Sequence, residues 1–318
     1  MKTSQIHKPF ASTVVLILAV ILSTFPGPRR AKAQALDTPS AHSVAGSPPG
    51  RTEKPHAHPF EPAEELVYVA EFSRALLKKV DVADFHFTAS TEPSLQQAVD
   101  SPNDENKGGD YLLKFTGDVS SKGFFSKLFN LRFRQQVESL VDPKSFSVQT
   151  TKRVDEQGKR ARISESVYRD GKVLWTERDP NNPSRAPRQA SATFAGPMQD
   201  VLSAIYYLRT QPLEVGKTFE LAVSDSGVVY QVPVKVVEQK RMKTAIGRVE
   251  AVRVDPEVFG ANRLLAGEGH FSIWLTNDSR HIPVSARIKM KYGTFDVKLR
   301  KVIKNPTTPE ALASKVPN

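Results

Sequence analysis

The sequence predicts a mainly β protein, in which a large curved antiparallel sheet or open barrel surrounds one central amphipathic helix. Short segments that alternate apolar and polar residues recur along most of the chain, as expected for strands with one buried face. Turn-forming pairs such as Asp170-Gly171 separate these segments. Only the stretch from Pro197 to Arg209 repeats apolar residues at steps of three and four, which is the helical period.

The first 33 residues have the pattern of a secretory signal peptide. Two lysines precede the apolar run Val14–Leu22, and small residues follow it. We expect cleavage near Ala33 or Ala35 and, in a cell with two membranes, a periplasmic protein. The apolar run is shorter than the ~20 residues that a spanning helix needs. An uncleaved N-terminal anchor is the alternative, because three cations lie close to the cleavage site.

Charge and cysteine content limit the classes of function. The formal net charge is +11, and removal of the signal segment, with its five cations and no acid, lowers it to +6. A modest basic excess on an exported protein favours an anionic membrane surface or an envelope glycan as partner, and we expect no nucleic acid. The chain has no cysteine, which excludes disulfides, thiolate metal sites, a cysteine nucleophile and lipid attachment through cysteine.

Composition divides the rest of the chain into three parts. Residues 34–62 are rich in Pro, Ser and His and are predicted to be a disordered linker, in which His56 and His58 form only an incomplete metal site. Residues 63–303 are predicted to be a single β-rich domain, and residues 304–318 a flexible tail.

Strands are predicted on both sides of the helix. The first is typical, since every second residue from Leu66 to Phe72 is apolar. A Pro-rich loop, residues 179–187, leads to the helix and divides the fold into two halves. About a dozen strands exceed the ~10 at which open sheets tend to curl. The predicted strands are 64–72, 80–89, 111–116, 145–154, 160–168, 172–178, 217–223, 228–237, 246–254, 270–275, 282–290 and 294–302, with a further strand that includes Leu131, Phe133 and Val137 if Lys122–Arg134 is a hairpin.

The predicted helix carries its own boundary signals. Pro197 suits a first helical turn, and Pro212 prevents continuation. Asp200 near the start and Arg209 near the end complement the helix dipole. We expect its apolar face to pack against the curved sheet. That face is formed by Met198, Val201, Leu202, Ile205 and Leu208.

Several motifs resemble an uncharacterised exported bacterial family, domain of unknown function 3108. The resemblance spans roughly Phe60 to Val302 and implies an exported, largely antiparallel β domain, with no catalytic residues assigned. Glu64-Glu65 departs from the Gly-Glu pair expected there. The motifs are Asp200–Arg209 followed by Leu213 and Gly216, Gly247 within its strand, Trp274–Pro283, Glu65–Tyr68 and Asp142-Pro143.

Four residues are candidates for ligand binding, namely Tyr206, Arg209, Trp274 and Arg280. Aromatic walls with an arginine at the lip of a concave sheet could hold an acyl chain or a sugar with an acidic group. Tyr206 is expected to point between the apolar face of the helix and solvent. The structural alternative places Trp274 in the core and Arg280 in a polar turn.

A second candidate site is the stretch Lys122–Arg134, which interleaves aromatic residues with cations. Phe124, Phe125, Lys127 and Phe129 could form a small finger that contacts a membrane, with the rings in the acyl region and the cations at the phosphates. The alternative is a hairpin tip that feeds a strand.

The sequence contains no motif for a phosphate loop, a paired-histidine metal helix or a serine nucleophile elbow. We therefore expect no cofactor and no metal, and favour a non-enzymatic periplasmic protein that binds an envelope lipid or polysaccharide or assists envelope assembly. One alternative is a hydrolase that combines His270 or His281 with Asp278 and a serine. Another is a purely structural domain for protein interaction. An apolar tunnel would favour lipid binding. A cleft that contains His, Asp and Ser would favour the hydrolase, and a fully packed interior would favour the structural domain.

Overall fold

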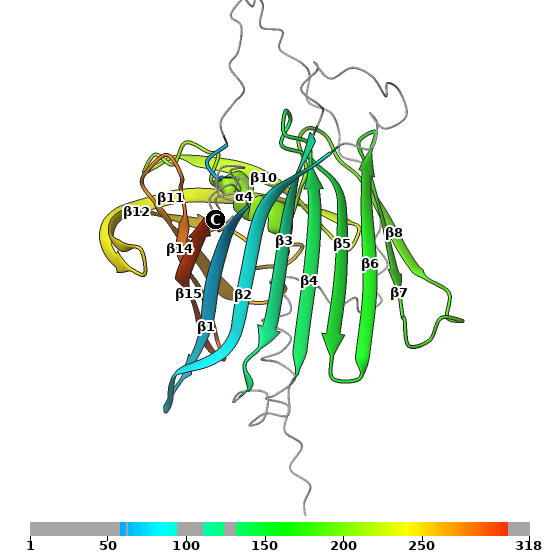
Figure 1. The fold of residues 1–318 in the computed structure, drawn as a ribbon, viewed down its shortest axis with the longest axis horizontal. Coiled ribbons are helices and arrows are strands. Elements are labelled where there is room, and N and C mark those ends of the chain that lie inside the picture. Colours follow the sequence, from blue (N-terminus) through cyan, green and yellow to red (C-terminus); the bar gives the residue numbers. More distant parts are fainter. Residues whose placement is uncertain (1–57, 62, 94–110, 124–131, 305–318) are drawn as a thin grey trace, which may run out of the picture.

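The computed structural model describes residues 58–61, 63–93, 111–123 and 132–304, which form one open sheet of 15 strands around one helix (Figure 1). The predicted signal segment, most of the predicted linker and the tail from 305 lie outside the described residues. The elements are β1 (Glu64–Arg74), β2 (Leu77–Pro93), β3 (Tyr111–Ser121), β4 (Phe133–Val141), β5 (Val148–Gln157), β6 (Arg160–Arg169), β7 (Lys172–Arg178), β8 (Arg188–Thr193), β9 (Gln199–Asp200), α4 (Val201–Leu208), β10 (Thr218–Asp225), β11 (Val228–Thr244), β12 (Gly247–Pro256), β13 (Gly269–Thr276), β14 (Pro283–Met290) and β15 (Gly293–Lys304).

The sheet consists of two meanders joined along β1 and β15. Its strand order is β8-β7-β6-β5-β4-β3-β2-β1-β15-β14-β13-β12-β11-β10-β9. All neighbours are antiparallel except β9 and β10, which share a short parallel pairing. The predicted mainly antiparallel, curved sheet is confirmed. The chain passes from one half to the other between β8 and β9, just before the helix, whereas loop 179–187 connects β7 and β8 within the first half, so the prediction that this loop is part of the boundary is wrong. The two edge strands, β8 and β9, are not paired with each other, so the sheet stays open.

The strands curve because one face is buried and several registers shift. In β4 every second residue, from Phe133 to Val141, is buried. β-Bulges interrupt the pairing of β1 with β2 after Ala70 and with β15 after Val67, and bulges bend strands and increase their twist. Fifteen twisted strands cannot remain a flat open sheet, so the sheet wraps toward its apolar face.

Helix α4 begins at Val201, and the prediction that Pro197 lies in its first turn is wrong. Asp200 is the N-cap, with an extended backbone. Its carboxylate accepts a hydrogen bond from the Ser203 amide, and the Ser203 hydroxyl accepts one from the Asp200 amide. This reciprocal capping box satisfies backbone N–H donors at the start of the helix. It places the first helical residue four positions after Pro197.

The helix lies inside the curve of the sheet. Leu202 is buried, and Gly117 of β3 faces it, so that a Cβ on Gly117 would lie 3.6 Å from the Leu202 Cδ1 atom. Tyr206 stacks on Phe115 with ring centroids 3.9 Å apart. Ile205, expected in the buried stripe, is only half-buried, because the helix turns Ser203 and Tyr206 toward the sheet instead.

The folded region starts before residue 63, where the sequence placed the domain boundary. Phe60 is buried and packs edge-on against Phe115 and Tyr206, with centroid distances of 5.4 and 5.5 Å. The carbonyl of Pro59 accepts a hydrogen bond from Arg209. The last residues of the predicted linker therefore contribute to the core.

The two ends of the sheet approach each other through side chains. Arg153 of β5 and Asp225 at the end of β10 form an ion pair of 2.5 Å that is almost fully buried. The turn after β10 packs on β8, because a Cβ on Gly227 would lie 2.7 Å from the Ala190 Cβ atom. Side-chain contacts of this kind hold the two halves of the sheet together, although the edge strands β8 and β9 do not pair with each other.

Strands β8 and β9 were not predicted from the sequence. β8 (RQASAT) lacks large apolar residues, and β9 has only two residues. Strand β11 also continues to Thr244, beyond the predicted end at 237. In the part of the chain that is described, no helix is long and apolar enough to cross a bilayer.

Replacing Leu202 with Ala should lower the free energy of unfolding by about 2–5 kcal/mol, because the change leaves a cavity between α4 and β3. Urea unfolding followed by circular dichroism measures this loss. Ile205→Ala is the matched control in the same helix, and it should cost clearly less because its side chain is only half-buried. Equal losses for the two variants would contradict the placement of the helix.

Candidate functional site

One row of paired residues shows which face of the N-terminal half points toward the helix. Gly117 of β3 faces Leu202, and residues directly opposite one another in neighbouring strands lie on the same face. The row therefore continues on the inner, concave face across β4 to β8. Its members after Gly117 are Val137, Arg153, Ser164, Glu177 and Arg188.

The neighbouring inward-facing row lies two residues away along each strand, and it is also polar. Gln135 pairs with Asp155, and Asp155 pairs with Arg162. On β3 and β4 the concave face carries Phe115, Val119 and Val137, whereas on β5 to β8 charged residues join the buried Val173 and Trp175. The interior thus changes from an aromatic core under the helix to a polar lining beyond it.

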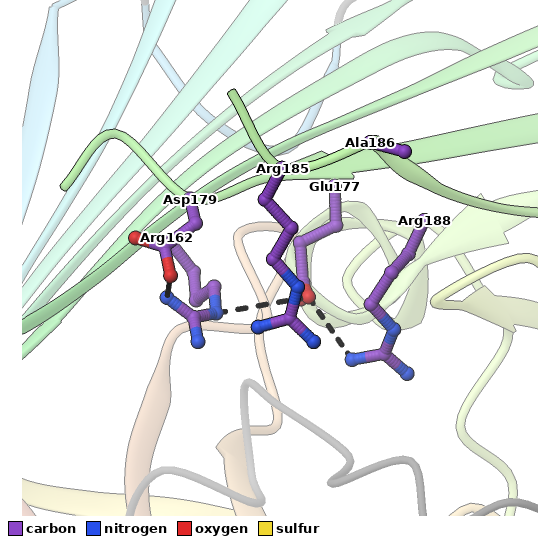
Figure 2. Close-up of a pocket in the computed structure, with 6 residues that line it drawn as sticks. All are labelled: Arg162, Glu177, Asp179, Arg185, Ala186 and Arg188. Atoms are coloured by element: carbon purple, nitrogen blue, oxygen red, sulfur yellow. Dashed lines mark hydrogen bonds and ion pairs between the residues drawn. The ribbon is translucent and has the colours of Figure 1, made fainter. Parts of the chain in front are cut away.

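A small hollow lies at the end of this polar lining (Figure 2). It is open to solvent, and its empty space is about 260 Å³ only when the adjoining solvent is counted. The residues that line it come from β6, from the end of β7, from the loop that follows and from the first residue of β8. They are Arg162, Glu177, Asp179, Arg185, Ala186 and Arg188.

Ion pairs position most charged groups of the hollow. Arg162 Nη1 lies 2.6 Å from Asp179 Oδ2, and Arg188 Nη1 lies 3.0 Å from Glu177 Oε1. Figure 2 shows three guanidinium groups gathered around Glu177, among which Arg185 makes no ion pair with any described residue. Three cations and two carboxylates leave the hollow with an excess positive charge.

The aromatic residue nearest this charge is Trp175. It is buried on the same inward face, and the Arg188 guanidinium carbon lies 5.9 Å from its ring centroid. A guanidinium over an indole face is held by cation–π attraction without using its N–H groups. Arg188 therefore keeps donors available to a ligand in addition to its bond to Glu177.

Asp155 is a half-buried carboxyl group on β5, directly opposite Arg162 of the hollow. Burial raises the pKa of its carboxyl above the ordinary value, and the neighbouring Arg153 only partly opposes this. Asp155 accepts a hydrogen bond from Gln135. A carboxyl group with a raised pKa in a polar concavity is typical of functional sites, although ion-pair networks that only support the fold also shift pKa values.

Three of the four ligand residues predicted from sequence are buried, namely Tyr206, Arg209 and Trp274. Tyr206 does not point toward solvent, since its ring stacks on Phe115 and meets Phe60 edge-on. Arg209 does not lie at a lip: its side chain is fully buried, with Nη1 2.5 Å from Glu64 Oε1. The periodicity that defines a helix does not say which of its polar residues a sheet will cover. Any contact of Tyr206 or Arg209 with a ligand stays a prediction.

Trp274 lies on β13 and Arg280 in the turn that follows it, where the Arg280 carbonyl accepts a hydrogen bond from Arg209. Trp274 is buried, as the core alternative predicted, and its side chain is on the face of β13 opposite Ile273 and Leu275. Lys240 Nζ covers its ring at 3.9 Å from the centroid. Arg280 is partly exposed in a turn where its amide donates to Asp278 Oδ1, as the polar-turn alternative predicted. The four residues therefore do not surround a common cavity, and their ligand roles also stay predictions.

The predicted membrane-contact residues Phe124, Phe125, Lys127 and Phe129 lie outside the described residues. The described ends of that connection are Gly123 and Arg132, at the ends of β3 and β4.

The groups of the hydrolase alternative are not assembled within the described residues. His270 Nε2 pairs with Asp255 Oδ2 at 3.2 Å rather than with Asp278, and His281 Nδ1 lies 2.9 Å from the Arg209 carbonyl oxygen. Neither imidazole contacts a serine hydroxyl among the described residues. No group of three or more potential metal ligands occurs in the described ranges either.

Sequence reasoning missed the charged hollow because its residues are spread over three segments. The loop 179–187 was identified only as a Pro-rich connection, and Arg185 and Arg188 carry no motif. The available signal was the period of two in β6 and β7, which places Arg162, Ser164 and Glu177 on the same face as buried residues.

Fold and site together define a β-barrel-like class of protein: one open antiparallel sheet that curls around a helix and is lined on one side by charged residues. The chain belongs to the family described as protein of unknown function DUF3108, whose model matches residues 96–300. No curated protein matches the chain.

Two solved structures are similar in part. One is a β-barrel-like protein of domain of unknown function DUF1849 from Brucella abortus, with 11% identity, a TM-score of 0.46, and coverage of 77% of this chain and 98% of that chain. The other, from Bacteroides fragilis, has a YmcC-like fold and is named, provisionally, as an exported protein. The two sequences are 7% identical, the TM-score is 0.32, and the match covers 78% of this chain and 98% of that chain.

Breaking the buried pair of Glu64 and Arg209 should be strongly destabilising. Arg209→Met leaves the Glu64 carboxylate buried without its partner, a change that typically costs about 3–5 kcal/mol. Urea unfolding measures it, and the double variant E64L/R209M should recover part of the loss because it removes both charges. Lys304→Met, which breaks an exposed pair with Glu61, is the control and should have a much smaller effect.

Asp155→Asn should change how stability depends on pH. The folded state holds the Asp155 proton more tightly than the unfolded state, so wild-type stability should fall relative to the variant as pH rises from about 4, the unfolded value, through the raised folded pKa. Urea unfolding at a series of pH values measures this difference.

Asp142→Asn provides the control of opposite sign. Burial acts to raise the pKa of Asp142, but hydrogen bonds from Ser145 and the Lys144 amide outweigh it, and the pKa lies below its ordinary value. The wild-type advantage over this variant should be present above about pH 4 and be lost as pH falls below it. The same slope for both variants would show that neither reports its local site.

Proposed function

We propose that the protein is an exported, non-enzymatic β protein that binds an acidic polysaccharide of the cell envelope in the charged hollow of its concave face. The observation that carries the proposal is the hollow itself, in which three arginines and two carboxylates converge and Arg185 makes no ion pair with a described residue.

The chemistry of the lining suits an acidic sugar. A guanidinium group presents a planar fork of N–H donors that matches a carboxylate, sulfate or phosphate group. Glu177 and Asp179 are fixed by Arg188 and Arg162, and their remaining lone pairs can accept hydrogen bonds from sugar hydroxyls. The excess positive charge favours an anionic ligand over a neutral one.

The lipid alternative has less support in the described part of the structure. An acyl chain needs an apolar cavity, and the aromatic side of the interior is occupied by α4 and Phe60. The polar side offers charged groups, which are costly to bury against a hydrocarbon chain. We therefore favour the glycan over the acyl chain. The periplasmic location and cleavage near Ala33 or Ala35 are part of the same proposal and rest on the N-terminal sequence.

Arg185→Ala should weaken binding of a uronic-acid oligosaccharide about tenfold or more, since charge-assisted hydrogen bonds contribute about 1.5–3 kcal/mol. Isothermal titration calorimetry with oligogalacturonate at low and high salt measures this. The matched control is Arg178→Ala, because Arg178 is exposed at the end of β7 on the face opposite Glu177.

The same titration decides the proposal. Arg178→Ala should leave affinity unchanged, a neutral oligosaccharide should bind far more weakly, and added salt should reduce the affinity for oligogalacturonate. Absence of binding by the wild type, or equal loss in both variants, would refute a glycan site in the hollow.

A further inference from the structure

Two adjacent turns form an exposed apolar tip at one end of the sheet. In the turn between β1 and β2, Leu76 is 98% exposed and Leu77 is 40% exposed. In the turn between β14 and β15, Tyr292 is 39% exposed. The turns are neighbours because Ser73 pairs with Thr294, and Gly293 lies so close to the Phe72 ring that a Cβ there would be 2.5 Å away.

Basic residues surround this tip. Residues 73–80 and 289–293 contain five lysines or arginines and no acid. Lys291 Nζ lies 4.7 Å from the centroid of the Tyr292 ring. Of the nearby acids, Glu71 is paired with Lys298 and Asp81 with Lys122, and Glu268 at the start of β13 is one carboxylate against the five cations. The tip therefore keeps a local positive charge beside its exposed leucines.

An almost fully exposed leucine at a hairpin turn is not explained by the fold, because it buries nothing there. Apolar residues ringed by lysines match the boundary of a bilayer that contains anionic lipids, where the side chains enter the acyl region and the cations meet the phosphates. We propose that this tip, formed by residues 74–79 and 290–293, docks the protein on an anionic membrane surface.

Docking at this end would also orient the charged hollow. Because neighbouring strands from β1 to β8 are antiparallel, the ends of β1 and β7 lie at the same edge of the sheet (Figure 1). The tip follows β1 and the hollow follows β7, six strands or about 29 Å away along the sheet. The docking proposal stands on the tip alone and is independent of glycan binding.

The absence of cysteine in the chain permits a site-specific test. We would label L76C with a polarity-sensitive nitrobenzoxadiazole dye and add vesicles of phosphatidylcholine and phosphatidylglycerol in equal parts. The emission should shift to the blue and be quenched by brominated acyl chains. Because the signal arises at position 76, an apolar N-terminal segment that remained on the chain would not produce it.

The matched control is V215C, carrying the same dye. Val215 is 52% exposed in the loop that follows α4. The helix C-cap, Arg209, binds Glu64 at the opposite end of β1 from Leu76, so the loop follows an element anchored far from the tip. Its dye should not respond to vesicles.

The charge requirement is tested in the L76C background. K78E/K79E should raise the vesicle concentration for half-maximal response at least tenfold, since each lysine near an anionic surface contributes about fivefold. K217E, an exposed lysine beside Val215, should change little. Pure phosphatidylcholine vesicles should give a much weaker response.

Several results would overturn the proposal. They are no response at position 76, an equal response at position 215, or a response that survives charge reversal or needs no anionic lipid. A blue shift that grows with protein concentration without vesicles, and that brominated lipid does not quench, would show that a second copy of the chain covers the tip instead.

Discussion

One buried guanidinium ties together the parts of the chain on which the curved sheet depends. Arg209, at the C-cap of α4, pairs with Glu64 at the start of β1 and donates to the carbonyls of Pro59 and Arg280. These contacts join the helix, the entry segment, the central seam of the sheet and the turn after β13. A buried charge persists only when it is paired and hydrogen-bonded, so this arrangement specifies where the helix sits as well as holding it.

With the helix held in that place, the interior divides into two chemically different regions. Under α4, aromatic rings from Phe60, Phe115 and Tyr206 fill the concave face. Beyond it, on β5 to β8, the same face presents charged and hydroxyl groups, and the Arg153 and Asp225 pair links it to the other half of the sheet. A sheet this wide has more inner surface than one short helix can cover, and the uncovered part is where polar residues face inward without loss of the core.

The pattern of residues anticipated the architecture better than the site. Alternation located most strands of the described chain, and the single helical period located α4, because both depend only on which residues can be buried locally. β8 and β9 were not predicted because an edge strand needs little apolar surface, and because these strands form by pairing with β7 and β10. The capping box of Asp200 and Ser203 also moved the helix start away from Pro197, since the N-cap depends on backbone conformation that a proline signal does not report.

The sequence alone determined the mainly antiparallel β class, the division into two halves, the absence of thiol chemistry and the family resemblance. These properties depend only on composition, local periodicity and short motifs. The tertiary structure decided which polar residues are buried and which are accessible. It turned Arg209 inward to Glu64, buried Trp274 beneath Lys240, and gathered Arg162, Glu177 and Arg185 around one hollow. Strand register and sheet curvature bring such distant residues together, and neither can be read from local periodicity.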